Sequence, residues 1–180
     1  GETRRHDAGM CGFAGVQRCE AAVWSGDVGS RWSDMRDQIS AGVNFSLSGI
    51  PNWTFDIGGY TMETRYGGWN IDAQPNIYTK PKPADLAEFN ELYTRWFEFG
   101  AFVPVFRSHG EIRRREIFEI SKPGTPIYNI LAFYDRLRYR LMPYIYTLGA
   151  DTYHKAGTIM RGLVMDFPND AKVRDIADEY

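Results

Sequence analysis

Two aspartates lie at the ends of apolar segments, where a carboxyl group could take part in acid–base chemistry. Asp27 follows the apolar run 21–24, and Asp56 stands near the end of the run 50–57. A carboxyl group at Asp27 that is partly removed from water would have a raised pKa and would suit a proton donor near neutral pH. Asp27 could instead cap the following helix, because Asp is a favoured N-cap, although Ser30 is better placed for that role. The residues alone leave this choice open.

A basic and an imidazole side chain follow a third apolar segment, residues 100–106. Arg107 could pair with a buried carboxylate, and His109 could donate a hydrogen bond to a hydroxyl group. A single histidine can equally have a structural role. Aromatic side chains, which pack well against the apolar faces of sugars, stand near these polar groups. They are Trp24, Trp53 and Tyr60. Together the residues are typical of a carbohydrate-binding rim.

The composition is that of a globular domain. The 180 residues are 43% apolar and 24% charged, enough for one domain with a hydrophobic core. The net charge of −2 gives no electrostatic reason to expect binding to nucleic acid or to an anionic membrane. Three consecutive arginines, residues 113–115, are interpreted as a solvent-exposed loop or helix face rather than as a binding patch.

The cysteines and histidines predict no metal site. Cys11 and Cys19 are the only cysteines, and their spacing from the three histidines fits neither a disulfide framework nor a set of metal ligands. We therefore expect two free thiols. No apolar stretch is long enough for a transmembrane helix, and the N-terminal residues contain no apolar signal region.

The elements that must position these side chains alternate between strands and helices. Strands are predicted over 21–24, 50–57 and 158–167. Helices are predicted from Ser30 to Gly42 or Leu47, through the apolar stripe 86–97, and over 126–155 with a kink at Pro143. A long loop covers 60–83. Buried strands that alternate with amphipathic helices indicate an α/β fold with parallel strands. Polar residues at the strand ends fit a β/α barrel, and fit a doubly wound sheet almost as well.

Five ordered motifs resemble glycoside hydrolase family 31. They are Trp-Ser-Gly-Asp (24–27), Ser-Gly-Ile-Pro-Asn-Trp-Thr-Phe-Asp-Ile-Gly-Gly-Tyr (48–60), Phe-Gly-Ala-Phe-Val-Pro-Val-Phe-Arg-Ser-His-Gly (99–110), Arg-Tyr-Arg-Leu-Met-Pro-Tyr (138–144), and Arg-Gly-Leu (161–163) with Asp-Phe-Pro (166–168). The resemblance implies a partial (β/α)8 TIM barrel, roughly its last three β/α units. The C-terminal portion of the barrel would cover residues 10–180, and residues 1–9 would be a disordered leader or a cloning scar.

The resemblance also implies roles for single residues. The activity would be that of a retaining α-glycosidase that releases terminal α-linked xylose or glucose, and the motif variants are most similar to bacterial α-xylosidases. Asp27 would be the acid/base, and Arg107 would pair with pocket carboxylates. The remaining implied binding residues are Trp24 in the pocket wall, Asp56 and His109 on the hydroxyls of the sugar in the −1 subsite, and Tyr60 at the pocket mouth.

Two departures from the family pattern stand upstream of Asp27. The family's nucleophilic aspartate precedes the Trp-Ser-Gly-Asp motif, and here the only earlier aspartate is Asp7, in a polar leader. Met10 stands where the family carries an arginine, unless an insertion lets Arg4 or Arg5 serve instead. A retaining mechanism needs two carboxyl groups about 5–5.5 Å apart. We therefore expect the isolated chain to be inactive, or to complement another fragment.

Partners and alternatives follow from the same resemblance. The partners would be an oligosaccharide substrate and either the missing part of the barrel or further copies of the chain. No metal or organic cofactor is expected, and no nucleic acid or membrane. The resembled enzymes fit a periplasmic or extracellular bacterial setting, but this sequence leaves the compartment open. An α-transglycosylase shares these motifs, and a non-catalytic sugar-binding or oligomerising remnant is the alternative outside the enzymes.

Overall fold

Three short parallel strands form the sheet that carries the polar side chains. The computed structural model describes residues 8–9, 15–19, 21–70, 77–78 and 80–180. Within them, β1 (Ala8–Gly9), β2 (Ala22–Trp24) and β3 (Trp53–Thr54) pair in that order, all parallel. Val23 is paired with Trp53, and both side chains are buried, as expected for a parallel sheet covered on its faces. Both strands predicted around these residues are confirmed, though each is shorter than predicted.

The pairing of β1 corrects the predicted leader. Ala8 lies opposite Ala22 and Gly9 opposite Val23, so residues 8 and 9 belong to the sheet. The leader predicted over 1–9 therefore does not extend through them, because a parallel ladder satisfies their backbone groups. Residues 1–7 and Met10 lie outside the described residues.

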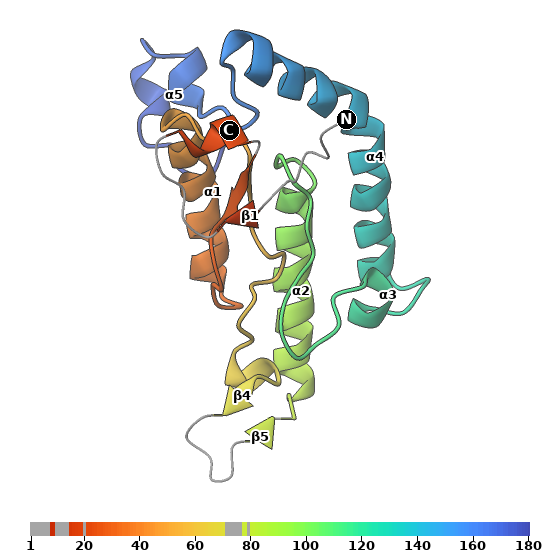
Figure 1. Cartoon of the computed structure of the whole chain (residues 1–180). Helices are drawn as coiled ribbons and strands as arrows, with labels where there is room; N and C mark the ends of the chain where they lie inside the picture. The colour runs from red at the N-terminus through yellow and green to blue at the C-terminus, as the bar shows by residue number, and fades with distance from the viewer. Residues whose placement is uncertain (1–7, 10–14, 20, 71–76, 79) are drawn as a thin grey trace.

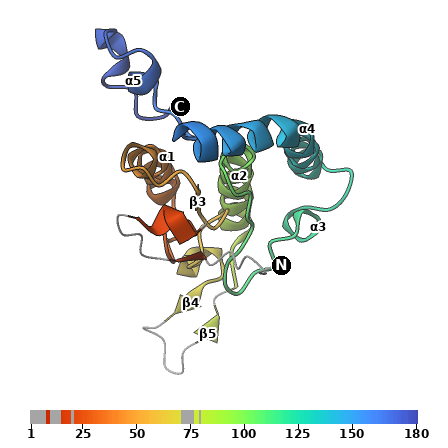
Figure 2. The same ribbon diagram turned by 45° about the horizontal axis from the view of Figure 1, so that its top comes forward.

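Three long helices stand side by side around the sheet. They are α1 (Trp32–Leu47), α2 (Pro83–Gly100) and α4 (Pro126–Lys155). Figure 1 and Figure 2 both show α2 between α1 and α4. The shorter elements are the helices α3 (Ile117–Ile120) and α5 (Leu163–Asp166), the 3-10 turns η1 (Val16–Cys19), η2 (Thr64–Tyr66) and η3 (Ala171–Val173), and the antiparallel pair β4 (Trp69–Asn70) and β5 (Ile77–Tyr78).

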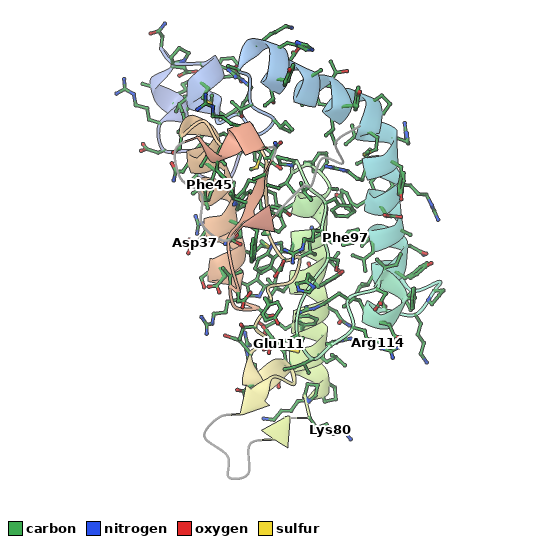
Figure 3. All side chains as sticks on the ribbon, viewed as in Figure 1. Asp37, Phe45, Lys80, Phe97, Glu111 and Arg114 are labelled. Atoms are coloured by element: carbon green, nitrogen blue, oxygen red, sulfur yellow. The ribbon has the colours of Figure 1, made fainter. Side chains whose placement is uncertain are left out.

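The core between the sheet and α2 is built from aromatic rings. Phe55 lies at its centre, with its ring centroid 4.7 Å from that of Phe99 and 5.3 Å from that of Trp53. Trp96 and Phe97 add further buried rings from α2, and Figure 3 labels Phe97 on that helix. Aromatic pairs at such separations contribute beyond the area that they bury. Aromatic residues make up 15% of the sequence, and they serve the core as well as the candidate site.

The helix predicted over 126–155 is confirmed with the same bounds. Pro126 occupies the first turn, where its missing N–H costs nothing, and the Thr125 hydroxyl accepts a hydrogen bond from the backbone N–H of Tyr128 at 3.3 Å. Figure 1 shows α4 bending strongly along its length. Pro143 lies inside the helix and explains the bend, because its ring removes one hydrogen bond and crowds the preceding turn.

Three sequence-based predictions about elements are wrong. Ser30 does not cap α1: the N-cap is Arg31, without a side-chain cap hydrogen bond, and the Asp34 carboxylate accepts from Gly29 N at 2.7 Å instead. The predicted strand 158–167 contains the short helix α5 instead, and an ion pair of 2.8 Å joins Arg161 to Asp166. The region 60–83 is also not one long loop, because it contains η2, β4 and β5.

No helix in the described part of the chain combines the length and the apolar character needed to cross a membrane.

Candidate active site

A buried ion pair forms the centre of the site. Asp56 follows β3, and its Oδ1 lies 2.6 Å from Nη1 of Arg107. The Asp56 side chain is 1% exposed and that of Arg107 is 32% exposed. Burial raises the pKa of Asp56 above its ordinary value. The positive charges of Arg107, His109 and Arg115 act in the opposite direction, and the negative charge of Asp27 adds to the rise. The pairing of Arg107 with a buried carboxylate is therefore confirmed.

Hydrogen bonds from β3 and from the residues just after it bring Arg107 to this position. The Thr54 hydroxyl donates to Val105 O at 2.8 Å, and Ile57 N donates to Arg107 O at 3.3 Å. The segment that ends at Arg107 thus runs beside β3, although it forms no regular strand. Arg138 fixes the start of the segment, because its guanidinium donates to the carbonyls of residues 101, 103 and 104.

Trp24 and His109 lie near the ion pair, and Tyr60 packs against His109. The Arg107 guanidinium carbon lies 5.8 Å from the ring centroid of Trp24, which is within cation–π range. The rings of Tyr60 and His109 are 5.4 Å apart. Tyr60 O accepts a hydrogen bond from Glu111 N at 3.1 Å, and this bond joins the loop after β3 to the loop after His109. The structure therefore gathers these predicted residues around Asp56.

Asp27 lies in the loop between β2 and α1, on the rim of the same site. Its backbone oxygen accepts from the Thr61 hydroxyl at 3.3 Å, and its charge acts on Asp56. The Asp27 side chain is exposed, so the prediction of a partly desolvated carboxyl group is wrong. The helix-cap alternative is also excluded, because the N-cap is Arg31. An exposed carboxyl group at a rim remains free to meet a ligand.

A tight double-glycine turn holds the Asp27 and Asp56 loops together. Gly58 and Gly59 have φ values of 87° and 74°, in the region that favours glycine. A Cβ at Gly59 would lie 2.5 Å from Gly29 O, so only glycine permits this approach of the two backbones. Thr61 N also donates to Val28 O at 3.1 Å. The Gly-Gly sequence therefore serves packing between loops.

One member of the arginine triplet belongs to the site's surroundings, which the sequence analysis missed. Arg114 is exposed, as its position in Figure 3 shows, but Arg115 is only 7% exposed. The Arg115 guanidinium donates to Gly59 O at 2.8 Å. The solvated-face interpretation is wrong for this residue, because Gly110, five residues away, and Gly58, which is distant in sequence, leave the space that its side chain fills. No local pattern reveals that space.

Among the residues that the structure describes, no three or more His, Cys, Asp or Glu side chains are grouped so that they could hold a metal ion. Cys11 lies outside the described residues, and the structure does not describe the side chain of Cys19. That both cysteines are free thiols therefore stays a prediction.

Comparisons with known proteins agree with this arrangement. Residues 8–148 match the glycosyl hydrolases family 31 TIM-barrel domain. The chain is 42% identical over 168 residues to an α-xylosidase of Saccharolobus solfataricus, covering 93% of this chain and 20% of that protein. It is 33% identical to α-glucosidase 2 of Bacillus thermoamyloliquefaciens, covering 94% of this chain and 18% of that one.

Solved structures of family 31 enzymes also resemble this chain. The crystal structure of an α-xylosidase from Xanthomonas citri superposes with a TM-score of 0.85 at 59% identity, covering 95% of this chain and 17% of that one. The Flavobacterium johnsoniae dextranase superposes with a TM-score of 0.77 at 30% identity, over 96% of this chain and 19% of that one. The chain thus spans about a fifth of the length of these relatives. Its parallel strands, its helices and its family match show that it is part of a (β/α)8 TIM barrel and belongs to glycoside hydrolase family 31.

Proposed function

We propose that this segment supplies the acid/base and sugar-binding residues of a retaining α-glycosidase that releases terminal α-linked xylose. The observation that carries the proposal is the buried Asp56–Arg107 pair with Asp27 on the adjoining rim. Relatives named as α-xylosidases, at 42% and 59% identity, favour xylose, whereas the α-glucosidase relative keeps glucose as the competing substrate.

Asp56 would accept a hydrogen bond from a sugar hydroxyl. Both carboxylate oxygens are buried without a hydrogen-bond partner among the described groups, although Oδ1 is in ion-pair contact with Arg107. A buried acceptor left without a partner costs free energy, and a ligand hydroxyl that satisfies it regains that energy. Arg107 favours the ionised form of Asp56, which is the form that accepts hydrogen bonds at both oxygens.

Trp24, Tyr60 and His109 would complete the subsite. The Trp24 ring offers an apolar face beside the Arg107 guanidinium, and His109 offers ring nitrogens next to Tyr60. Aromatic faces bind the C–H faces of a pyranose, while the imidazole donates or accepts at a hydroxyl. This division between apolar and polar contacts is the pattern expected of a small-molecule site.

Asp27 would act twice in the reaction. A second carboxylate attacks the anomeric carbon while Asp27 donates its proton to the leaving glycosidic oxygen. Asp27 then removes a proton from the water that hydrolyses the glycosyl-enzyme. An exposed position on the rim lets Asp27 exchange protons with solvent between the two steps. No residue of this chain is assigned as the nucleophile.

The activity would belong to a longer parent enzyme. Family members have about five times the length of this chain, and large aromatic side chains of α4 are exposed here. The exposed fractions are 73% for Tyr139, 82% for Tyr146 and 83% for Tyr153. Exposed apolar surface of this kind favours burial against a partner. The remainder of the parent would cover it, and self-association of the chain is the competing outcome.

The test compares the parent enzyme with its Asp27→Ala and Asp37→Ala variants. Asp37 is the matched control, because it is an exposed aspartate on α1, labelled in Figure 3. Hydrolysis of 4-nitrophenyl α-xyloside should exceed that of the α-glucoside. Asp27→Ala should abolish most of the hydrolysis of an α-xylosyl disaccharide. On the 4-nitrophenyl α-xyloside it should lower kcat rather than kcat/KM, because only release of the glycosyl-enzyme then lacks its base. Asp37→Ala should leave both activities intact. A parent that cleaves neither substrate, or an Asp27→Ala variant as active as Asp37→Ala, contradicts the proposal. Transfer of the sugar to an added acceptor in preference to water would favour an α-transglycosylase instead.

A further inference from the structure

Arg115 is a buried cation enclosed by the loops that carry the site. It is 7% exposed, and its guanidinium carbon lies 5.1 Å from the ring centroid of Phe89. Burial lowers the pKa of Arg115 to about 10. Removing a guanidinium from water is costly unless carbonyls, rings or anions compensate for the lost hydration. A long arginine side chain normally extends its guanidinium into solvent. The contacts that Arg115 makes with the protein must therefore hold its guanidinium in the interior.

The guanidinium sits between two glycines from different loops. Nη2 donates to Gly59 O at 2.8 Å. A Cβ at Gly58 would lie 2.8 Å from Nη1, and a Cβ at Gly110 would overlap Nη2. The Gly58–Gly59 turn follows Asp56, and Gly110 follows His109. The Arg115 side chain therefore fills the space between the two loops that present the polar groups.

The backbone of Arg115 holds the second loop from the other side. Its carbonyl oxygen accepts from the Tyr93 hydroxyl at 2.7 Å and from the Ser108 hydroxyl at 3.2 Å. Ser108 stands between Arg107 and His109, and Tyr93 is a fully buried residue of α2. The loop of Arg107 and His109 is thus tied to the helix layer through Arg115.

Arg115 also contributes charge at Asp56. The charged groups that act on Asp56 are Arg107, His109, Asp27 and Arg115. Arg107 makes the direct ion pair, and Arg115 acts from behind the Gly58–Gly59 turn. The Arg115 charge lowers the pKa of Asp56, and its effect is smaller than those of Arg107 and His109.

We propose that Arg115 is a positioning residue of the glycosidase site, one that fixes the Gly58–Gly59 turn against the loop of Arg107 and His109. It touches no substrate and acts through Asp56 and that loop. The inference rests on the proposed function. The Arg115 charge also lowers the pKa of Asp56, against the larger rise caused by burial, so its removal should change the pH dependence of the reaction as well as its rate.

The experiment compares Arg115→Met with Arg113→Met in the parent enzyme. Arg113 is a close match, because its guanidinium carbon lies 5.2 Å from the same Phe89 ring, but its hydrogen bond goes to Ile120 O at 3.5 Å. Arg115→Met should lower kcat/KM by roughly 10²-fold, the cost of a small misplacement of binding groups. The acid limb of its kcat/KM profile should move to higher pH, since the pKa of Asp56 rises further. Arg113→Met should keep the wild-type profile.

Arg115→Lys separates charge from geometry. It retains a cation but lacks the planar fork that reaches Gly59 O. We expect the acid limb near its wild-type position together with a lowered kcat/KM. Arg115→Lys also serves as the test if Arg115→Met fails to fold, as judged by circular dichroism. A wild-type kcat/KM in Arg115→Lys overturns the inference, and so does equal behaviour of Arg115→Met and Arg113→Met.

Different results would contradict the proposed glycosidase function and the positioning role of Arg115. A parent without glycosidase activity, or one insensitive to Asp27→Ala, removes the proposed function itself. An active parent that depends on Asp27 but responds equally to Arg115→Met and Arg113→Met removes only the positioning role of Arg115.

Discussion

Replacing Arg107 by Met should destabilise the fold far more than the loss of an ordinary ion pair. The change removes the cation that lies 2.6 Å from Asp56 Oδ1 and leaves a carboxylate that is 1% exposed without its partner. At an effective dielectric constant of about 20, two charges at that separation attract by about 6 kcal/mol. This gain must offset the cost of burying the carboxylate.

The net cost is smaller than the attraction. Removing one partner of a buried pair typically costs about 3–5 kcal/mol. Arg107 is 32% exposed, so solvent screens the pair and places the expected loss near the lower end, at about 3 kcal/mol. Protonation of Asp56 in the variant limits the loss as well. The loss should therefore be smaller in acid than at neutral pH, because a protonated Asp56 needs no cation.

Urea unfolding of the chain, followed by tryptophan fluorescence, measures this loss. Arg114→Met is the control, because Arg114 lies 3.3 Å from Glu119 in an exposed pair and should cost less than about 1 kcal/mol. In the double variant with Asp56→Asn, most of the Arg107→Met loss should disappear, giving a coupling energy of about 2 kcal/mol. A loss no larger than that of Arg114→Met, or a coupling energy near zero, would refute the assignment of a buried, interacting pair.

Two further predictions concern Asp56 and the turn that follows it. Burial raises the pKa of folded Asp56 above its ordinary value of 3.8, so the wild type loses stability relative to Asp56→Asn as pH rises from that value through the folded pKa. Thermal unfolding between about pH 4 and about pH 7 should show this trend, while Asp56→Asn loses sugar binding; a difference that is independent of pH would contradict it. Gly59→Ala should destabilise the chain more than Gly49→Ala, which should cost about 1 kcal/mol for its left-handed backbone. Both glycines have similar positive φ, but only the Cβ at position 59 meets a backbone atom within 4 Å, and equal urea midpoints would contradict this reasoning.

The elements that local signals define were predictable from the sequence. Thr125 and Pro126 mark the start of α4, and its bounds were predicted correctly because cap and first-turn preferences act between near neighbours. The strands before Asp27 and Asp56 were also found, since short apolar runs ending in polar residues are typical of buried parallel strands. The apolar run 158–167 does not form the predicted strand, because a short apolar run cannot be assigned to a strand or a helix by its period alone.

The candidate site was only partly predictable. A basic residue after an apolar run predicts that Arg107 pairs with a buried carboxylate, but only the structure identifies that partner as Asp56. The exposure of Asp27 was not foreseen, since burial depends on how the loops meet at Gly59. The burial of Arg115 could not be predicted for the same reason, because Gly58, more than fifty residues away, leaves part of the space that its side chain fills.

The leaving-group dependence of Asp27→Ala tests the central claim most directly. A 4-nitrophenolate leaves without a proton, whereas the sugar of an α-linked disaccharide needs one, so only the second substrate depends on an acid in the first step. The account predicts that Asp27→Ala in the parent enzyme lowers kcat/KM for the disaccharide by roughly 10²–10⁴-fold, with a much smaller loss for the 4-nitrophenyl α-xyloside. Equal losses on both substrates, or no loss on the disaccharide, would contradict the role of Asp27 as the general acid.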